Sequence, residues 1–329
     1  MHVAAGWIVG VAIVGVAAIV VLATVAARST GPLVLVEVLL PHLVLGTLVL
    51  AVVMAGLLRT RAMTVALAIL VVVAAGRFGS DWISIPSATP AGTLVDLVSW
   101  NHEWGAGPSD AVAGPLLDHD ADVVALQELT LDAAAALDAD PRVLARYPYR
   151  LLVPSSGSAG VGILSALPMV DSSTFEDPPG MSVTLDVGSG RRLRVVNNHP
   201  PHGQIATLGG SRLPVGIDAR DRDAALGQIR TRIEPALAAG VPLVLIGDYN
   251  TAPTEPGYAV LSRGLRDVQV EVGLGPGWTW RPTSLEWLGI GLLRIDLVLA
   301  GPKVLPVSYA VDCHQPGDHC IVAATVAVQ

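Results

Sequence analysis

Three long apolar segments at the start of the chain constrain its fold more than any other feature. They run from about Ala4 to Ala27, from Leu33 to Leu58 and from Ala62 to Gly76. The first two exceed the ~20 residues that a helix needs to cross a bilayer. The third would be about 22 Å long as a helix at ~1.5 Å per residue, so we expect it to extend towards Trp82. The sequence therefore predicts a membrane anchor of three transmembrane helices over residues 1–79.

The charges that flank these segments predict their orientation. Arg59 and Arg61 lie together in the short connection between the second and third segments. Because cytoplasmic loops carry an excess of Lys and Arg, this connection is expected in the cytoplasm. The chain would then be a multi-pass protein of the cell membrane, with everything after about Ser80 outside the cytoplasm. Arg28 and Arg77, on the outer side, oppose this orientation.

The rest of the chain has the composition of a water-exposed α/β domain. After a linker over residues 80–92, which contains Pro, Ser and Thr, short β-branched strands alternate with Ala-rich helical stretches such as Arg220 to Ala239. We expect one catalytic domain over residues 93–329, which is long enough to enclose a single large core. A formal net charge of −8 makes a nucleic-acid partner unfavourable.

The stretch from Leu243 to Asn250 has the pattern of a buried strand that delivers polar side chains to a site. Successive strand residues alternate faces, so Asp248 and Asn250 are expected to point the same way. Gly247 would allow another part of the chain to approach closely. A carboxylate beside a carboxamide suits the orientation of a water and the binding of a phosphate or metal. An Asx turn that only closes the strand explains the same residues equally well.

Other apolar strands also end in polar residues that could carry chemistry. These residues are Asn101, Glu103, Glu128, His199, Asp296, Asp318 and His319. Strand alternation would place Asn101 and Glu103 on one face. Glu128 would offer an oxygen ligand to a hard cation, although it could equally belong to the start of the helix expected after it. A single histidine is more often structural than functional. None of these residues decides the function by itself.

In their order along the chain these residues resemble the motif series of the endonuclease/exonuclease/phosphatase family, the metal-dependent phosphoesterases similar to DNase I. The matching stretches are Ser99-Trp-Asn101, Leu126-Gln-Glu128, Val195-Val-Asn-Asn-His199, Gly247-Asp-Tyr-Asn250, Arg294-Ile-Asp296 and Gly317-Asp-His319. The resemblance covers the chain from about Leu94 to the C-terminus. It implies an α/β fold in which two packed mixed sheets flanked by helices form a four-layer β-sandwich, preceded here by the three transmembrane helices.

The resemblance also implies a metal site. Glu128 would be the principal ligand of a divalent cation, with Mg²⁺ expected first and Mn²⁺ or Ca²⁺ as alternatives. Asn101 and Asp318 would assist it, and Glu103 occupies a position where some members have a second metal-facing carboxylate. The family's usual Ser before the Asp-His pair is Gly317 here. That departure removes a hydroxyl group but no expected ligand.

The remaining motif residues would act on the phosphate. By the same resemblance, His199 and Asn250 would contact it, and Asp248 would orient or deprotonate the attacking water. His319, oriented by Asp296, would be the remaining acid, base or phosphate partner. A His–Asp pair suits that role because the carboxylate fixes the imidazole tautomer and stabilises its charged form.

An apolar run beside the expected site bears on the substrate. Trp287 to Leu293 reads Trp-Leu-Gly-Ile-Gly-Leu-Leu and directly precedes the strand of Asp296. In a domain tethered by three spans, we expect this run to face the membrane or a lipid tail, since Trp is favoured at the interface. An ordinary core segment is the alternative.

The two cysteines of the chain, Cys313 and Cys320, flank the Asp318-His319 pair. In an oxidising compartment a pair seven residues apart across a Pro-Gly turn could form a disulfide that staples this loop. Two free buried thiols are the alternative.

The anchor together with this domain resembles the VanJ-type membrane proteins associated with teicoplanin resistance. The implied partners are membrane lipids and a lipid-linked phosphate or pyrophosphate of the cell envelope, and glycopeptide-antibiotic resistance is an implied role. A surface-tethered nuclease is a second interpretation. A non-catalytic envelope protein on the same scaffold is a third, and the near-complete motif set argues against it.

Overall fold

The computed structural model describes residues 2–25, 28–84, 90–103, 109–209, 211 and 213–329. The chain divides into two compact units. The first contains the residues up to Trp82 together with Gly203–Arg220 and Thr254–Pro256, and the second contains the remainder from Ile83 onward. Residues 85–89, in the middle of the predicted linker, lie outside the described residues.

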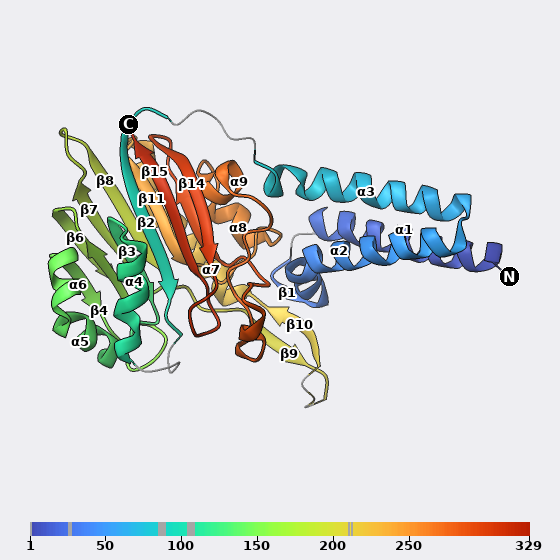
Figure 1. The fold of residues 1–329 in the computed structure, drawn as a ribbon, viewed down its shortest axis with the longest axis horizontal. Helices are drawn as coiled ribbons and strands as arrows, with labels where there is room; N and C mark the ends of the chain where they lie inside the picture. Colours follow the sequence, from blue (N-terminus) through green and yellow to red (C-terminus); the bar gives the residue numbers. More distant parts are fainter. Residues whose placement is uncertain (1, 26–27, 85–89, 104–108, 210, 212) are drawn as a thin grey trace. The chain divides into compact units, whose positions relative to one another are not determined.

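Three helices form most of the first unit: α1 (His2–Val25), α2 (Pro32–Leu58) and α3 (Arg61–Trp82) (Figure 1). Each is long and apolar enough to cross a membrane. α3 continues beyond its short apolar segment, as expected, and its last residue Trp82 stacks on Phe78. The prediction of three long apolar helices is therefore confirmed.

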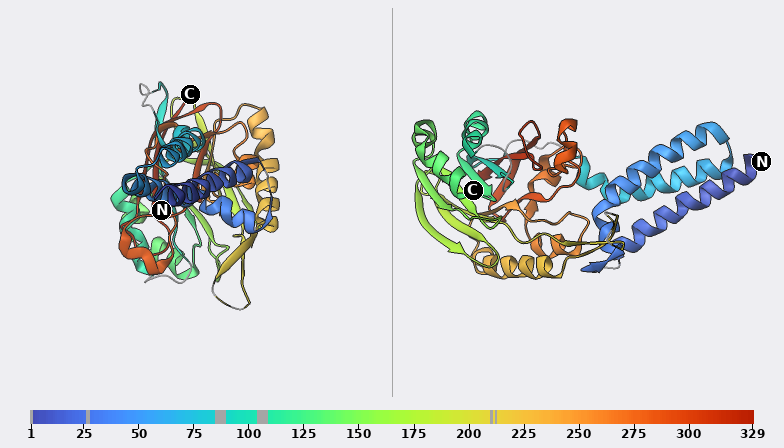
Figure 2. Two further views of the ribbon diagram at one scale, coloured as in Figure 1. Left: turned by 90° about the vertical axis from the view of Figure 1, so that its right-hand side faces the viewer. Right: turned by 90° about the horizontal axis from the view of Figure 1, so that it is seen from below.

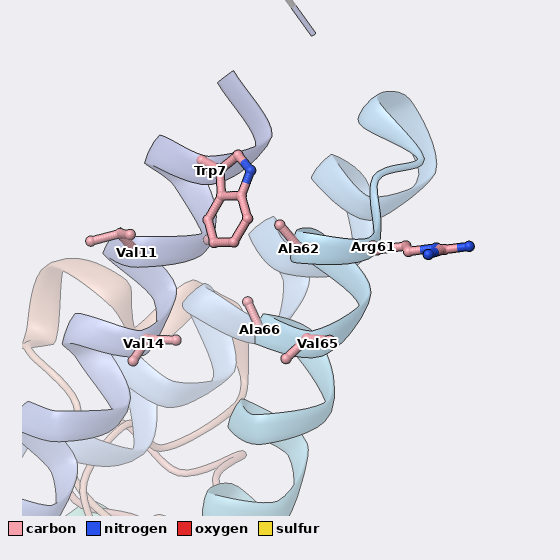
Figure 3. Close-up of a pocket in the computed structure, with 8 residues that line it drawn as sticks. Trp7, Val11, Val14, Arg61, Ala62, Val65 and Ala66 are labelled. Atoms are coloured by element: carbon pink, nitrogen blue, oxygen red, sulfur yellow. The ribbon is translucent and has the colours of Figure 1, made fainter. Parts of the chain in front are cut away.

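The three helices are apolar on their exposed faces as well as on the faces that pack together. Val11 in α1 and Val72 in α3 are 67% and 72% exposed. An apolar pocket of about 360 Å³ lies between α1 and α3 beside Trp7 (Figure 3). A helix that is apolar all round is typical of a membrane span.

A small three-stranded sheet completes the first unit. β9 (Gln204–Thr207) and β10 (Pro214–Asp218) form an antiparallel hairpin. β10 also pairs with β1 (Thr30–Gly31), which lies between α1 and α2. Ile217 is buried against Val34 in the first turn of α2. A segment far along the chain thus packs on the start of a predicted membrane span.

The second unit is a sandwich of two six-stranded mixed sheets (Figure 1). The first sheet has the order β14-β15-β2-β3-β5-β4. Its strands are β14 (Val304–Asp312), β15 (Ile321–Val328), β2 (Thr93–Asn101), β3 (Val123–Gln127), β5 (Val161–Ser165) and β4 (Tyr149–Val153). The second sheet has the order β12-β13-β11-β8-β7-β6. Its strands are β12 (Arg266–Asp267), β13 (Asp296–Ala300), β11 (Leu243–Asp248), β8 (Arg192–Asn198), β7 (Gly180–Asp186) and β6 (Met169–Phe175).

Apolar side chains fill the space between the two sheets, and helices cover their outer faces. Val95 and Leu97 of the first sheet share one buried cluster with Val195 and Ile246 of the second. The first sheet is covered by α4 (Ala113–His119), α5 (Leu131–Ala139) and α6 (Pro141–Arg146), and the second by α7 (Arg220–Ala238) and α8 (Pro256–Leu261). The two helix groups lie on opposite sides of the sheets (Figure 2). The predicted four-layer sandwich is confirmed.

The strand directions bring the predicted site residues to one edge of the sandwich. β2 is parallel to β3, and β8 is parallel to β11. The parallel pairs therefore end together, just before or at Asn101, Glu128, His199 and Asp248. β13 runs antiparallel to β11, so its first residue, Asp296, stands directly opposite Asp248. This pattern explains why residues spread over more than half of the chain meet at one place.

Candidate active site

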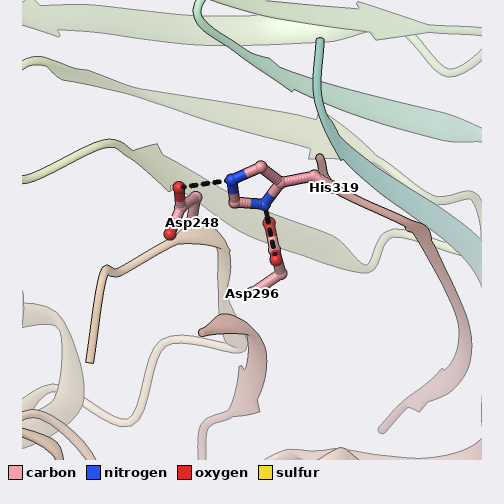
Figure 4. A group of neighbouring side chains, drawn as sticks. All are labelled: Asp248, Asp296 and His319. Atoms are coloured by element: carbon pink, nitrogen blue, oxygen red, sulfur yellow. Dashed lines mark hydrogen bonds and ion pairs between the residues drawn. The ribbon is translucent and has the colours of Figure 1, made fainter. Parts of the chain in front are cut away.

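Three side chains form a hydrogen-bonded triad at this edge: Asp248, Asp296 and His319 (Figure 4). The Nδ1 atom of His319 donates to Asp296, at 2.9 Å from Oδ2 and 3.2 Å from Oδ1. Its Nε2 atom lies 3.5 Å from Oδ2 of Asp248. All three side chains are buried. Asp296 therefore fixes the imidazole so that Nε2 points at Asp248, as the sequence analysis expected for the His–Asp pair.

The triad holds a negative and a positive charge next to each other. Burial acts to lower the pKa of His319, but the Asp296 and Asp248 carboxylates outweigh it and raise that pKa to about 10. Burial acts to raise the pKa of Asp248, but the His319 and His199 side chains outweigh it and hold that pKa at about 2. At neutral pH Asp248 is thus a carboxylate, and His319 is a cation.

The raised pKa of His319 predicts how stability depends on pH. An unfolded His titrates near ~6.5, so the stabilisation from its charge is fully present below that pH. The stabilisation is lost progressively as the pH rises towards the folded pKa of about 10. We expect the melting temperature of the detergent-solubilised, EDTA-treated protein to fall between pH 7 and 10. His319→Gln should flatten this decline, and an equally steep decline in that variant would contradict the assignment.

Asp248 also contacts two further predicted site residues. Its Oδ2 atom accepts a hydrogen bond from Asn101 Nδ2 at 3.0 Å and lies 3.5 Å from His199 Nε2. His199 donates its Nδ1 hydrogen to the carbonyl of Ser158 at 2.9 Å, which turns Nε2 into the site. Burial acts to lower the pKa of His199, but Asp248 and Glu128 raise it. His199 can therefore present a second positive charge to a phosphate.

The Asx turn considered as an alternative for Asp248 is present as well. Oδ1 of Asp248 accepts a hydrogen bond from the backbone N–H of Asn250 at 2.8 Å. One carboxylate oxygen thus closes the strand while the other faces the site. The expectation that strand alternation aligns Asn250 with Asp248 was wrong, however, because β11 ends at Asp248 and Asn250 adopts a left-handed conformation with φ 52°. The turn, and not strand alternation, places Asn250, whose Nδ2 donates to the carbonyl of Pro200 at 3.0 Å.

Gly247 has the close approach that the sequence predicted. Its φ of 145° disfavours other residues, and a Cβ atom there would lie 2.5 Å from the carbonyl oxygen of Asn198. The glycine therefore allows β11 and β8 to approach each other beside Asp248 and His199.

The four predicted metal ligands form a connected group next to the triad. Asn101 Nδ2 donates to Glu128 Oε1 at 3.2 Å, and Asn101 Oδ1 accepts from the backbone N–H of Glu103 at 2.9 Å. Oε2 of Glu103 in turn accepts from the backbone N–H of Asp318 at 2.9 Å. Glu103 follows the end of β2 in a left-handed conformation with φ 55°, so the expectation that strand alternation aligns it with Asn101 was wrong. The structure nevertheless brings all four residues together.

Backbone strain is concentrated at these positions. Glu103, Glu128 and Asn250 have φ values of 55°, 54° and 52°, a region that costs non-glycine residues free energy. Gly317 has a φ of 109°, which explains the glycine where the family has Ser. Glu128 is also distinct from the helix start considered as its alternative, because Thr130 caps α5.

Two residues that the sequence analysis missed hold the loop of Asp318 and His319. Trp280 Nε1 donates to Asp318 Oδ2 at 2.9 Å. Arg281, fully buried, donates to the carbonyls of Cys313 and Gln315 at 3.1 and 3.2 Å. Cys313 and Cys320 form a disulfide, which confirms the staple. Apart from its aromatic residues, the stretch Trp278-Thr-Trp-Arg281 has no sequence feature that would have predicted these contacts.

A further residue that the sequence analysis missed ties the two sheets together below the site. Asn197 Nδ2 donates to the carbonyls of Leu126 and Gly162 in the opposite sheet, both at 2.9 Å. Gln127 Nε2 donates to Asn197 Oδ1 at 2.8 Å. Asn197 and Gln127 are both fully buried, so these hydrogen bonds are shielded from water. They fix the strand ends that carry Glu128 and His199.

Comparison with known proteins identifies the fold and the family. The model of the endonuclease/exonuclease/phosphatase family matches residues 98–319. The chain belongs to this family. It is therefore assigned to the metal-dependent phosphoric ester hydrolases. No curated protein matches the chain.

Solved structures agree with the fold. The endonuclease/exonuclease/phosphatase of Bacteroides vulgatus is 19% identical, with a TM-score of 0.56 over 72% of this chain and 100% of that one. TDP2 of D. rerio complexed with single strand DNA product is 18% identical, with a TM-score of 0.56 over 72% and 100%. The 3' phosphatase NExo of Neisseria bound to product DNA hairpin is 20% identical, with a TM-score of 0.54 over 70% and 98%. At these identities the likeness shows the fold.

The residues at the site suit a divalent cation. Oδ1 of Asp318 is buried without a hydrogen-bond partner among the described residues. Burial, together with Glu103 and Glu128, raises the pKa of Asp318 to about 6. Hard cations such as Mg²⁺ prefer oxygen ligands, and a cation here would relieve the repulsion between neighbouring carboxylates. Glu128, Asn101, Asp318 and Glu103 could therefore hold the family's metal.

The triad is a second group of side chains that could hold a cation. Ligand atoms of Asp248, Asp296 and His319 lie within 4.8 Å of one another. Both imidazole nitrogens already face a carboxylate, however, so a cation bound through His319 would have to replace a proton that faces Asp296 or Asp248. The group around Glu128 therefore offers a cation more accessible oxygen ligands than the triad does.

Proposed function

We propose that this protein is a membrane-anchored, extracytoplasmic phosphoesterase that hydrolyses a phosphate ester or pyrophosphate of a lipid-linked substrate. The observation that carries the proposal is an exposed apolar turn attached to the candidate metal site. The turn belongs to the 3-10 helix η2 (Thr283–Leu288) and the residues after it. Trp287 and Ile290 are 78% and 51% exposed, and Leu288 is 37% exposed.

Two contacts attach this turn to the acidic group. Thr283 Oγ1 donates to Glu103 Oε1 at 3.4 Å at the start of η2. Trp280, three residues earlier, donates to Asp318. An apolar surface this close to charged residues costs solubility unless something apolar covers it. A lipid tail on the substrate, or the membrane interface where Trp is favoured, would cover it.

The roles of the residues follow from their charges. Asp248, held ionised, orients the attacking water and accepts its proton. His199 and His319 offer positive charge to the phosphoryl oxygens and a proton to the leaving oxygen. Asn250 would be a further phosphate contact. A divalent cation would neutralise the charge that develops on the phosphoryl group, and we expect this cation to be Mg²⁺.

Two observations support the proposal that the second unit lies outside the cytoplasm. β10 pairs with the connection between α1 and α2, and the chain then crosses twice, through α2 and α3, before the second unit begins. The connection and the end of α3 therefore lie on one side. The Cys313–Cys320 disulfide favours an oxidising compartment for that side. Arg59 and Arg61, between α2 and α3, favour the cytoplasm for the other side.

The apolar turn predicts a specific change in substrate selectivity. In the double variant Trp287→Ser with Leu288→Ser, hydrolysis of a polyprenyl pyrophosphate in mixed micelles should fall about tenfold or more, which is the effect of losing ~1.4 kcal/mol of apolar contact. Hydrolysis of a soluble model phosphodiester should be unchanged. The measurement is kcat/KM on both substrates.

A matched control uses other exposed apolar residues of the same unit. Val153 and Val170, on the edge strands β4 and β6, are 41% and 45% exposed. Their double replacement with Ser should leave both activities unchanged. Equal loss on both substrates in the Trp287 and Leu288 variant, or no loss, would contradict a lipid-binding role.

Parallel assays on polyprenyl pyrophosphate, phospholipid and DNA test the proposed function as a whole. We expect turnover of the first to exceed that of the others. A nuclease is the alternative, favoured by the DNA products in the TDP2 and NExo structures. The net charge of −8 opposes it, since phosphate-backbone binding needs basic residues. Preference for DNA would replace the lipid-linked proposal with this alternative.

We further propose that the chain belongs to the VanJ-type subgroup and acts on an envelope carrier. Its three apolar helices and the catalytic motifs support this assignment. Expression in a susceptible host should then raise teicoplanin tolerance, and the Asp248→Asn variant should not.

A further inference from the structure

The β9–β10 hairpin is the second feature of the chain that suggests a contact with lipid, and it lies in the first unit. Its sequence carries little charge and several large apolar residues. From Gln204 to Ile217 there is one charged residue, Arg212. Four large apolar side chains of the hairpin are 38–64% exposed: Ile205, Leu208, Leu213 and Val215.

Hydrogen bonds fix the base of the hairpin to the connection between two predicted spans. Thr30 pairs with Asp218 and Gly31 with Ile217, and the N–H of Ala219 donates to the carbonyl of Ser29 at 2.7 Å. A two-residue strand between two membrane helices must lie where the bilayer ends. The hairpin base therefore lies at the membrane boundary.

The length of α2 sets the depth of this contact. With 27 residues α2 is about 40 Å long at ~1.5 Å per residue, which is longer than the ~30 Å hydrocarbon core. This extra length allows its first turn, with Val34, to lie at the level of the headgroups. Ile217 and Ala219 bury against Val34 at that level. With Val34 at that level, β10 would lie within the interfacial layer and not in bulk water.

The buried face of the hairpin continues into an exposed one. Ile205 stands directly opposite Ile217 across the β9–β10 pair, so the two side chains project from the same face. Ile217 is 8% exposed because α2 covers it, whereas Ile205 is 64% exposed. The apolar face that packs on the membrane helix therefore extends outwards without a protein cover among the described residues.

We propose that the β9–β10 hairpin is an interfacial element that inserts its apolar side chains among the lipids of the leaflet at the α1–α2 connection. The occupant of its open face is the bilayer, because the face is continuous with a helix that the bilayer already surrounds. A single basic residue and no acidic one between Gln204 and Ile217 suit a phospholipid surface. The hairpin belongs to the first unit, whereas the turn at Trp287 belongs to the second.

The test places a fluorophore on the hairpin of the full-length protein in liposomes. Ile205→Cys, labelled with NBD, is compared with Ser173→Cys, which lies on the exposed strand β6 of the second unit. The native cysteines are in a disulfide, so only the new thiol reacts. We expect blue-shifted emission at position 205 and quenching by brominated phosphatidylcholine at a depth of roughly 5–10 Å, as for other interfacial segments. The label at position 173 should emit as in water.

A second variant, Leu213→Cys, guards against misfolding at one position and should give the same result. Unchanged hydrolysis of a soluble phosphodiester by each labelled variant shows that it is folded. Water-like emission at both hairpin positions would overturn the proposal. So would a blue shift that brominated lipids do not quench, because a second copy of the chain or another protein would then cover the hairpin.

Discussion

Replacing Asp248 with Asn is expected to lower kcat by about 10²–10⁴-fold, the range for loss of a general base. The substituted amide cannot accept the proton of the attacking water. It also removes the negative charge that His199 and His319 face at 3.5 Å. The measurement is the rate of hydrolysis of a soluble phosphodiester by the solubilised full-length protein, which does not depend on the identity of the lipid substrate.

Stability must be measured in the same variant, because Asp248 is also structural. Its two oxygens accept hydrogen bonds from Asn101 and from the N–H of Asn250. An Asn side chain has one accepting group, so one of these donors loses its partner at a cost of about 1–3 kcal/mol. Rates should therefore be compared well below the melting temperature. Asp171→Asn, on the exposed strand β6, is the matched control and should leave both quantities unchanged. A folded Asp248→Asn protein with near-normal activity would exclude Asp248 as the base.

Replacing Glu128 with Gln is expected to weaken divalent-cation binding and to lower activity by about 10³-fold, since a metal ion contributes several kcal/mol to transition-state stabilisation. EDTA should abolish hydrolysis by the unmodified protein, and Mg²⁺ or Mn²⁺ should restore it. The Glu128→Gln variant should need a higher metal concentration before its hydrolysis is restored. Titration calorimetry with each cation measures the affinity directly.

The same experiment distinguishes the two possible cation sites. If the group around Glu128 holds the metal, Asp296→Asn should leave cation affinity nearly unchanged while it disturbs His319. If the triad holds the metal, Asp296→Asn should abolish binding and Glu128→Gln should not. Glu176→Gln, at an exposed position, serves as the control and should change neither affinity nor rate.

Local features of the sequence were enough to predict several parts of the structure. The three apolar helices follow from composition, because a backbone that crosses lipid must satisfy its own hydrogen bonds. The strands that end at or just before Asn101, Glu128, His199 and Asp248 follow from alternating or continuous apolar runs that stop at polar residues. The order of these motifs along the chain identified the family, since each one keeps its place in the fold.

The conformation at the strand ends could not be predicted in the same way. Strand alternation was extended by two residues at Glu103 and at Asn250, and both adopt left-handed turns instead. A turn at the end of a strand depends on which hydrogen-bond partners are nearby. For Asn250 the partners are the Asp248 side chain and the carbonyl of Pro200, which comes from a different part of the chain. A local sequence pattern does not show which residues from distant parts of the chain will form hydrogen bonds.

The sequence by itself therefore determined which segments form long apolar helices and which polar residues end the strands at one edge of the sandwich. Only the tertiary structure decided that Asn197 joins the two sheets below the site, that Arg281 holds the Asp318 loop, and that β10 pairs with β1. The physical reason is distance along the chain. Composition and periodicity report a residue's own surroundings over a few turns or strands. Thr30 and Asp218 meet only because the folded backbone brings their unsatisfied hydrogen-bonding groups together.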